Sequence, residues 1–574
     1  MLSNDSRRYP SDALVEPDER PRDAPERQLG DFDVSKSVLR LGLLSLVIGV
    51  CVTFFALGLL DLIGLITHLA YTGTLDTHIT RPDTTALGPF SALVPVAGGL
   101  IVGLMARLGS ERIRGHGIPE AMETILLRGS RMEPRLAILK PLSSAISIGT
   151  GGPFGAEGPI IVTGGALGSI FGQLLHLTAA ERRSLLVAGA AAGMTAVFGT
   201  PVAAVLLAVE LLLFEWRPRS MIPVALAASI AEVVREMLSH SGLIHAVPLF
   251  PMATSGSLPS SMIAGAALVG LAGGGLAWVM TGCVYGAEDL FGRLRLHWTW
   301  WPALGGVVVG VGGLIDPRAL GVGYDTIGAE LAGRLAVGTL LALLLVKLVV
   351  WAVALGSNTS GGILAPLLML GGALGGLLGA GLGGAGEGTW ALLGLAAALA
   401  GVTRSPFTSI VFAVELTHSV NSLFALLVAC TIAHLVSVLL LKRSILTEKV
   451  ARRGHHVTRE YQIDPLQALL VRDVMSTGQS LDPDASGVTR AHPDETLRVV
   501  ADRMVITGSG VIPVVERGDP HLTVGFVGPL DLLRAHERVL VEERHRERPL
   551  DPLRFAAGLG SRGRRRLRRR ERVS

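Results

Sequence analysis

The feature that most constrains the fold of this chain is an apolar segment, interrupted by glycine and proline, that occurs twice. The sequence PIIVTGGALGSIFG begins at Pro159, and its counterpart PLLMLGGALGGLLG begins 207 residues later at Pro366. A second pair, PVAAVLLAVEL at 201–211 and PFTSIVFAVEL at 406–416, recurs at nearly the same spacing. Duplicated helices that are broken at corresponding positions are typical of membrane transporters, whose sites lie near the bilayer midplane between the repeats. Hydropathy alone does not decide between parallel and inverted repeats.

Charge-free windows long enough to span roughly 30 Å of hydrocarbon recur along the chain, most clearly at 41–60, 87–105, 262–282 and 419–441. The sequence is 49% hydrophobic and only 17% charged, whereas soluble domains are about 25% charged. A disordered chain, a collagen-like fibre and a soluble enzyme are therefore excluded. We predict a polytopic α-helical membrane protein whose membrane domain covers 38–455.

The two ends of the chain have a different composition. Residues 1–37 are polar and predict a flexible cytosolic segment. Residues 561–574 contain eight arginines, which suit the anionic lipid headgroups of a cytoplasmic leaflet; we expect no nucleic-acid partner. The three cysteines lie far apart in apolar segments and predict neither a disulfide framework nor a zinc site.

Three segments within the membrane domain place glycine and proline where a simple span would carry leucine: GHGIPE at 115–120, GAEGP at 155–159 and GGILAP at 361–366. Proline favours the first turn of a helix, and glycine allows the backbone to approach a ligand closely. Free N–H groups and a partial positive charge make helix N-termini anion sites. A permeant ion must also be bound weakly enough to leave. The three segments together predict a pathway for anions, built without lysine or arginine.

Glu157 stands at the start of a predicted helix in the second of these segments. Because an intramembrane carboxylate is costly, it indicates function by default. We interpret Glu157 as a tethered competitor that occupies the anion path when ionised and leaves it when protonated. The alternative is an acid that only stabilises its helix N-terminus. Glu210 and Glu415, repeated in AVEL, are interpreted as packing or interhelical hydrogen-bonding groups.

In these motifs the chain resembles the CLC family of chloride channels and chloride/proton antiporters. GHGIPE resembles the family's GSGIP(E) signature, GAEGP its G(K/R)EGP and GGILAP its GxFxP, while 443–454 resembles the segment that carries a central pore tyrosine. The resemblance covers roughly 38–455. It implies two inverted-topology repeats with broken and re-entrant helices, and a homodimer with one anion pathway in each subunit.

The resemblance also implies roles for individual residues. Glu157 would be the gating glutamate, and backbone N–H groups would hold the anion. The implied anion pathway comprises His116, Gly117, Ile118, Pro119, Gly155, Gly158, Gly362, Ile363, Leu364 and Leu446.

The chain departs from the family pattern at several of these positions. Ala156 replaces lysine or arginine, and Leu364 replaces phenylalanine. Leu446 falls where the pore tyrosine is expected, so one hydroxyl donor to the central anion is missing. Leu211 falls where the antiporters carry an internal proton-transfer glutamate, and a leucine cannot relay a proton. We therefore favour a voltage- or pH-gated chloride channel, with an antiporter that uses another inner proton route as the alternative.

Three further polar residues in apolar segments have open interpretations. His116 stands where most family members have serine, and it could donate a ring N–H to the anion or bond to a backbone carbonyl outside the path. Lys140 could raise the local potential for anions, with snorkelling as its alternative. For Lys347 we expect snorkelling.

Soluble composition begins near residue 466. The segment 466–540 combines a helix–strand alternation with PVV and VGFVGPLDLL, and it resembles one CBS motif. Because CBS motifs normally pair, pairing across a dimer is expected. An adenosine nucleotide could bind such a domain, although no residue here requires one. The residues 456–465 would form a linker and 541–574 a basic flexible tail.

Two other classes of protein were weighed. An intramembrane metalloprotease needs H-E-x-x-H, which the chain lacks, and we expect no enzyme activity. A divalent-cation transporter with CBS regulation needs clustered acidic ligands, whereas the acids here are isolated. We expect no metal and no required cofactor, with chloride-like anions and possibly protons as cargo. The predicted location is a bacterial inner membrane with both termini cytoplasmic.

Overall fold

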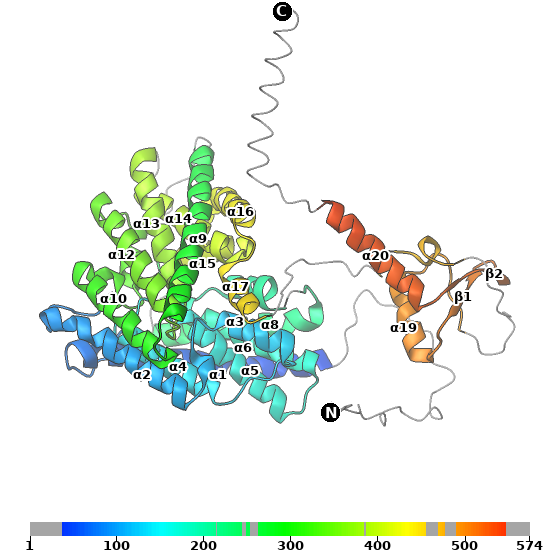
Figure 1. Cartoon of the computed structure of the whole chain (residues 1–574), viewed down its shortest axis with the longest axis horizontal. Helices are drawn as coiled ribbons and strands as arrows, with labels where there is room; N and C mark the ends of the chain where they lie inside the picture. Colours follow the sequence, from blue (N-terminus) through cyan, green and yellow to red (C-terminus); the bar gives the residue numbers. More distant parts are fainter. Residues whose placement is uncertain are drawn as a thin grey trace, which may run out of the picture.

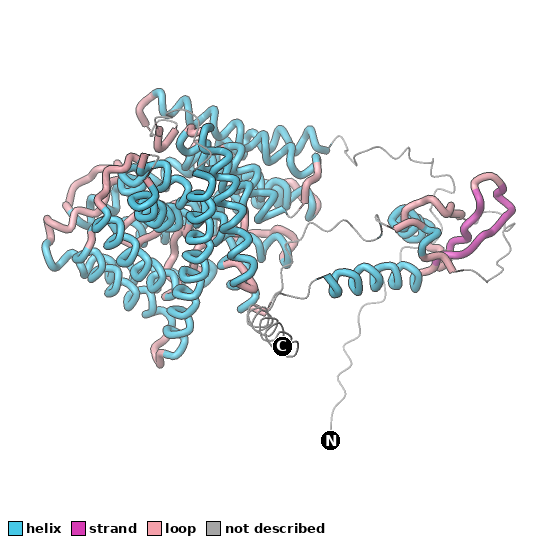
Figure 2. The backbone as a smooth tube through the Cα atoms, turned by 90° about the horizontal axis from the view of Figure 1, so that it is seen from above, coloured by secondary structure: helices cyan, strands magenta, loops and turns pink. Residues whose placement is uncertain are grey.

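The computed structural model describes residues 37–213, 215–243, 248–252, 262–383, 386–454, 466, 469–476 and 489–546. The predicted linker at 456–465, almost all of the predicted N-terminal segment and the arginine-rich part of the tail lie outside these residues. Figure 1 shows the chain coloured along its sequence, and Figure 2 shows that helices make up nearly all of its larger part.

Helices in the first half of the membrane domain run from blue to cyan-green in Figure 1. They are α1 (Ser37–Tyr71), α2 (Val94–Leu108), α3 (Ile118–Leu127), α4 (Leu136–Gly149), α5 (Glu157–Leu174), α6 (Ala179–Phe198), α7 (Pro201–Leu207) and α8 (Pro218–His240). A π-helical segment, η3 (Ala208–Leu213), continues α7.

The second half repeats this order from green to yellow. Its helices are α9 (Met262–Arg293), α10 (Trp301–Ile315), α11 (Tyr324–Leu331), α12 (Val337–Gly356), α13 (Leu364–Leu382), α14 (Glu387–Thr403), α15 (Pro406–Thr417) and α16 (Leu423–Leu440), followed by α17 (Ile445–Arg452). Short 3-10 helices join them: η1 (Gly88–Leu93), η2 (Glu111–Ile113), η4 (Trp298–Trp300), η5 (Pro317–Ala319) and η6 (Val420–Ser422).

Seven helical segments of the described chain are long and apolar enough to cross a membrane. Several others, among them α4, α7 with η3, α14 and α15, are apolar but shorter. The prediction of a polytopic helical protein is thus confirmed, and the glycine- and proline-rich segments do interrupt helices. Proline stands in the first turn of α7, α15 and α3, where its missing N–H removes no helical hydrogen bond.

The two halves pack in corresponding ways. In the first half α5 packs on α6 and α1 on α8, and in the second α13 packs on α14 and α9 on α16. Glycines make this close packing of helices possible. A Cβ on Gly164 of α5 would lie 2.2 Å from the Gly189 carbonyl oxygen of α6, and a Cβ on Gly371 of α13 would lie 2.5 Å from the Gly394 carbonyl oxygen of α14.

Reciprocal contacts relate the halves to each other. Gly155 and Gly362, which occupy equivalent positions, pair in antiparallel fashion: the Gly155 N–H donates to the Gly362 carbonyl (3.2 Å) and the Gly362 N–H to the Gly155 carbonyl (2.9 Å). Exchange of the same bond between equivalent residues is what a local two-fold axis produces, as inverted-topology repeats require. The axis passes between the starts of α5 and α13.

The C-terminal part of the described chain is a small α/β unit. It contains η7 (Val471–Asp473), α19 (Leu497–Thr507), the antiparallel strands β1 (Ile512–Glu516) and β2 (Asp519–Val527), and α20 (Pro529–Arg546). Its apolar core is formed by Val471, Ala491, Leu497, Val500, Met504, Ile512, Val514, Val527 and Ala535. The helix α20 runs to Arg546, past the boundary at 540 predicted for this unit.

Candidate anion pathway

The three interrupted segments of the membrane domain meet at one place, although they are far apart in sequence. Besides the Gly155–Gly362 pair, a backbone bridge joins Gly115 to Ser360, so the segment before α3 lies beside the segment before α13. The starts of α3, α5 and α13 are thereby held next to one another. This is the convergence of helix N-termini that the sequence predicts.

Glycine is required at this meeting point because backbones touch there. A Cβ on Gly158 would lie 2.2 Å from the His116 carbonyl oxygen. A Cβ on Gly117 would lie 2.8 Å from the Gly158 carbonyl oxygen, and Gly117 also has a φ of +92°, which a side chain disfavours. Any larger residue at either position would push the starts of α3 and α5 apart.

The Glu157 side chain is fully buried and folds back over this glycine cluster. A Cβ on Gly155 would lie 1.8 Å from its Oε2 atom, and a Cβ on Gly362 would lie 2.7 Å from the same atom. The backbone N–H groups of Glu157 and Ala365 face the carboxyl group. Neither carboxyl oxygen completes a hydrogen bond within the described residues. The group therefore stands where the N-termini of α5 and α13 meet.

The starts of α5 and α13 differ from that of α3 in their capping. No side chain caps Ala156 or Ile363, the residues at the N-caps of α5 and α13. At α3, by contrast, the Gly117 N–H donates to Glu120 Oε2 (3.0 Å). Glu120 is held in turn by Arg453, the residue that follows α17, at 2.7 Å. At α3 the Glu120 side chain therefore occupies the Gly117 N–H, whereas the N-caps of α5 and α13 carry no such bond.

The remaining residues of the predicted pathway are buried at the same meeting point. Ile118, Pro119 and Leu364 are buried at the starts of α3 and α13. His116 is 3% exposed, and its Nδ1 atom has no hydrogen-bond partner within the described chain. An unpartnered ring nitrogen is what a histidine that faces a ligand would show. The alternative, a bond to a backbone carbonyl, would have to use the other ring nitrogen.

The two intramembrane lysines hold equivalent loops. Lys140 Nζ donates to the carbonyls of Ile113 and Gly115, each at 2.7 Å. Lys347, 207 residues later, donates to the Ala319 carbonyl at 2.8 Å and the Gly321 carbonyl at 3.4 Å.

Both lysine side chains are completely buried. The prediction that Lys347 snorkels is therefore wrong, and so is the snorkelling alternative for Lys140. The physical reason is that each ammonium finds two carbonyls at the end of a loop, so it has no need to reach the membrane surface. The carbonyls held are those just before α3 and α11.

Polar groups surround the start of α17, near the meeting point. Leu446 is buried in its first turn, and the Tyr285 hydroxyl donates to the carbonyl of the preceding residue, Ile445. One turn later, Lys449 Nζ binds Glu288 Oε1 (2.6 Å) and Asn358 Oδ1 (2.7 Å). Lys449 thus ties α17 to the segment before α13, and Arg453, which follows the helix, ties its end to the start of α3.

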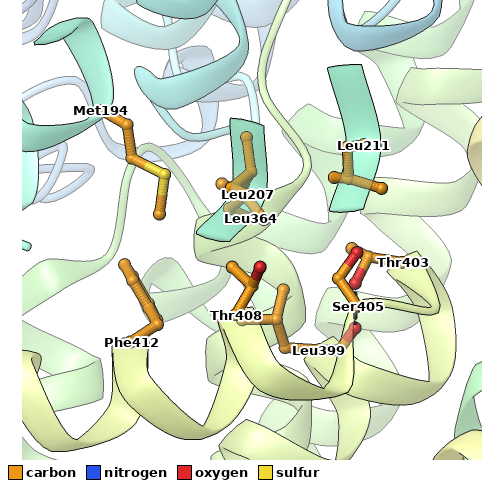
Figure 3. A pocket seen from close by; sticks show the side chains of 9 residues that line it. All are labelled: Met194, Leu207, Leu211, Leu364, Leu399, Thr403, Ser405, Thr408 and Phe412. Atoms are coloured by element: carbon orange, nitrogen blue, oxygen red, sulfur yellow. Dashed lines mark hydrogen bonds between the residues drawn. The ribbon is translucent and has the colours of Figure 1, made fainter. Parts of the chain in front are cut away.

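Leu211 lines a small apolar cavity of about 10 Å³, which Figure 3 shows from close by. Leu364, at the start of α13, faces the same cavity, which is completed by Met194, Leu207, Leu399, Thr403, Ser405, Thr408 and Phe412. A space this small holds one water molecule at most. No titratable side chain lines it.

The two AVEL glutamates bond across the repeats, as the sequence predicts. Glu210 accepts from the N–H groups of Phe407 (3.3 Å) and Thr408 (2.9 Å) at the start of α15. Glu415 accepts from the N–H groups of Val202 (2.9 Å) and Ala203 (2.8 Å) at the start of α7. Each repeat thus caps a helix of the other.

The described residues contain no group of three or more His, Cys, Asp or Glu that could hold a metal ion. Residues 98–438 match the sequence profile of the family described as voltage gated chloride channel, which covers more than half of the chain. The chain belongs to this family.

Individual members of the voltage-gated chloride channel family are similar to this chain over most of their length. The voltage-gated ClC-type chloride channel ClcB of Escherichia coli is 32% identical over 382 residues, which are 64% of this chain and 89% of that protein. A ClcB-like chloride channel protein of Ralstonia nicotianae is 29% identical over 348 residues, 59% of this chain and 80% of that one.

Solved structures of the family share the fold. A slow cyanobacterial Cl⁻/H⁺ antiporter has a TM-score of 0.63 at 21% identity, covering 72% of this chain and 98% of that one. A CLC-type fluoride/proton antiporter has a TM-score of 0.60 at 22% identity, covering 71% and 97%. A eukaryotic CLC transporter has a TM-score of 0.61 at 20% identity and covers 86% and 98%.

Sequence reasoning missed the paired role of the two lysines and overlooked two further polar residues near the site of this chloride channel family member. The equal spacing of Lys140 and Lys347 was a usable signal, since it matches the spacing of the repeat. Glu330 and the Tyr324 hydroxyl gave no signal, because the groups around them come from other helices. Both are buried and without a hydrogen-bond partner within the described residues.

Proposed function

We propose that the protein conducts chloride and similar anions across the membrane through a pathway lined by the N-termini of α3, α5 and α13, with Glu157 as its gate. The observation that carries this proposal is the position of the Glu157 carboxyl group between the uncapped starts of α5 and α13. A carboxylate and a chloride ion are both anions, so they compete for the same N–H groups. Protonation removes the charge that holds the side chain there.

A pathway lined by backbone N–H groups binds its anion only weakly. The anion would meet backbone dipoles instead of a full opposing charge, and conduction requires that it can leave again. The two buried lysines support this reading, because their ammonium groups are directed at loop carbonyls. They would position the loops before α3 and α11 and add a positive background potential without contacting the anion.

We further propose that proton coupling is weak or absent. By the family resemblance Leu211 falls where the antiporters carry the inner proton-transfer glutamate, and it faces a cavity of about 10 Å³ that no titratable side chain lines. Leu446 cannot supply a hydroxyl group to the central anion. Chloride/proton exchange by another inner route is the alternative, and two solved relatives of the same fold are antiporters.

Reversal potentials distinguish these two functions. Purified protein in a planar bilayer under crossed chloride and pH gradients should reverse at the chloride equilibrium potential. Leu211→Glu alone should not restore coupling, because Leu446 still leaves the inner site without its hydroxyl donor. A wild-type reversal potential that follows the pH gradient in a fixed ratio would establish the antiporter.

The anion pathway itself is tested by flux from liposomes. Vesicles that contain the purified protein should release chloride when a potassium ionophore is added, and they should take up no magnesium. Empty vesicles and vesicles with a pathway-blocked variant, Gly158→Leu, serve as controls. Magnesium uptake without chloride release would support the divalent-cation transporter and reject the proposed function.

The assembly and location follow from the resemblance to the family. We propose a homodimer with one pathway per subunit, in a bacterial inner membrane with both termini cytoplasmic. The unit over 466–540 would be a single CBS motif that pairs across the dimer. An adenosine nucleotide could bind there, and anionic lipids could bind the basic tail.

A further inference from the structure

One buried carboxyl group remains that the anion pathway does not use. Glu330, on α11, is 3% exposed, and neither of its carboxyl oxygens has a hydrogen-bond partner within the described residues. Its Oε2 atom lies against α13, where a Cβ on Gly372 would be only 2.3 Å away. A buried carboxylate without hydrogen bonds or a close counter-ion is strongly disfavoured relative to the neutral acid. Glu330 therefore needs a proton or a compensating charge.

Lys347 is the charge that faces it. Its ammonium group is within electrostatic range of both Glu330 and Glu157. Two of its three protons are engaged by the Ala319 and Gly321 carbonyls, which fix the position of the ammonium group. Among the described residues no other ionised group faces Glu330.

The other helices that pack on α11 add no charge there. The described side chains of α13 and α14 include no titratable group, and Asp325 of α11 itself is exposed to solvent. The Tyr324 hydroxyl, at the start of α11, faces Glu157 and Arg235. Glu157, Glu330 and Lys347 thus form a group of three buried ionisable side chains, with the two acids against the first half of α13.

The distance between the two acids can be bounded from α13. Glu157 faces the Ala365 N–H in the first turn of that helix, and Glu330 lies against Gly372, seven residues further on. A rise of about 1.5 Å per residue separates these two contact points by roughly 10 Å along the helix axis. One lysine can offset one negative charge, so two ionised acids would leave a net negative charge in a dry interior.

We propose that Glu330 is a second protonation site of the gate, and that at neutral pH the two acids share one proton while Lys347 balances the remaining negative charge. This inference rests on the proposed role of Glu157. When the proton resides on Glu330, Glu157 is ionised and occupies the anion site. When it moves to Glu157, Glu330 becomes the ionised partner of Lys347, the side chain of Glu157 is released, and the net charge of the group stays the same. Coupled acids of this kind titrate as a unit.

The consequence is a fraction of open protein at neutral pH that does not depend on the external proton concentration. Acid then adds a second proton and opens the rest. In Glu330→Gln the charge of Lys347 serves Glu157 alone, so Glu157 stays ionised to lower pH. We expect the midpoint of acid activation of chloride flux to move toward acid by about one pH unit, the repulsion between two unit charges roughly 10 Å apart at an effective dielectric constant of about 20.

The test measures chloride efflux against pH for purified wild type, Glu330→Gln, Glu157→Gln and the double variant. Asp325→Asn, which removes an exposed carboxylate from the same helix, is the matched control and should follow the wild type. The double variant should behave as Glu157→Gln alone. If Glu330→Gln follows the wild-type profile while Glu157→Gln flattens it, the shared proton is rejected and the gate stands. If Glu157→Gln keeps the wild-type profile, both are rejected.

An infrared measurement does not depend on the folding of Glu330→Gln. Wild-type protein at neutral pH should show the C=O band of one protonated buried carboxyl group. In Glu157→Gln this band should disappear, because Glu330 is then free to ionise beside Lys347. A wild-type spectrum without that band at neutral pH would overturn the proposal.

Discussion

The two repeats share a scaffold but differ in the side chains that they bring to the centre. Each begins its interrupted helix after a glycine that pairs with its counterpart, Gly155 with Gly362. Each also holds an earlier loop, the one before α3 or α11, with a buried lysine, Lys140 or Lys347. Yet the first repeat places Glu157 at the start of α5, where the second places Leu364 at the start of α13. The backbone is duplicated, and the proposed gate is not.

This difference separates what holds the site from what operates it. Groups present in both repeats bind backbone carbonyls or N–H groups and position helix ends. Groups present in one repeat only, among them Glu157, His116 and Glu330, are buried with polar atoms left unpartnered within the described residues. We expect the first kind to affect stability in both halves alike, and the second kind to affect flux and its pH dependence.

The largest effect is expected at the lysines. Lys140→Met and Lys347→Met each leave two buried carbonyls without a donor, which costs about 2–4 kcal/mol in the free energy of unfolding. Thermal unfolding in detergent should show a similar loss for both variants. Lys442→Met, at an exposed position, is the control and should unfold like the wild type. A loss of stability in only one of the two variants would mean that the two lysines do not hold their loops in equivalent ways.

The crossed glutamates should give a smaller and again symmetric effect. Glu210→Ala and Glu415→Ala each uncap one short helix, at a cost of about 1 kcal/mol. Each cap lies across the repeat boundary, so the same unfolding assay should detect both. Glu→Gln at the same positions retains an acceptor oxygen and should lose less. A change in chloride/proton coupling without loss of stability would instead indicate a transport role for Glu210.

The duplication made much of this scaffold predictable from sequence. The repeated segments indicate paired, interrupted helices, and the three glycine–proline motifs predict which helix starts meet. The hydrogen bonds from the two lysines to loop carbonyls were missed, because each lysine was interpreted by itself as a snorkelling side chain. Neither was compared with its counterpart 207 residues away. Glu330 could not be predicted, since Lys347 and Gly372, the groups that define its setting, come from α12 and α13.

The smallest effect is expected at His116. Its counterpart in the second repeat is Val322, because each follows the glycine whose carbonyl a buried lysine holds, and valine cannot titrate. Imidazole titrates near pH 6.5 in water, but burial disfavours its charged form and moves this titration toward acid. An imidazolium ion formed at the site would attract the anion as acid also neutralises Glu157. His116→Ser should keep conduction intact and change the chloride/nitrate preference. It should also make the pH dependence of flux shallower, with a shift of its midpoint of less than about one pH unit.

Val322→Ser is the matched control for His116 and should leave the pH profile unchanged. If His116→Ser retains both the wild-type pH profile and the wild-type selectivity, the ring faces away from the path and bonds elsewhere. The orphaned Nδ1 atom would then need another explanation.

The central claim is that the Glu157 carboxylate competes with permeant anions for the helix starts of α5 and α13. The most direct measurement is the chloride efflux of Glu157→Gln from liposomes between acid and neutral pH, with protein incorporation matched to the wild type. Glutamine keeps the shape of the side chain and removes its charge. We predict a higher flux at neutral pH and a nearly flat pH profile. A variant that incorporates normally but retains the flux and pH dependence of the wild type would reduce Glu157 to a helix cap and contradict the account.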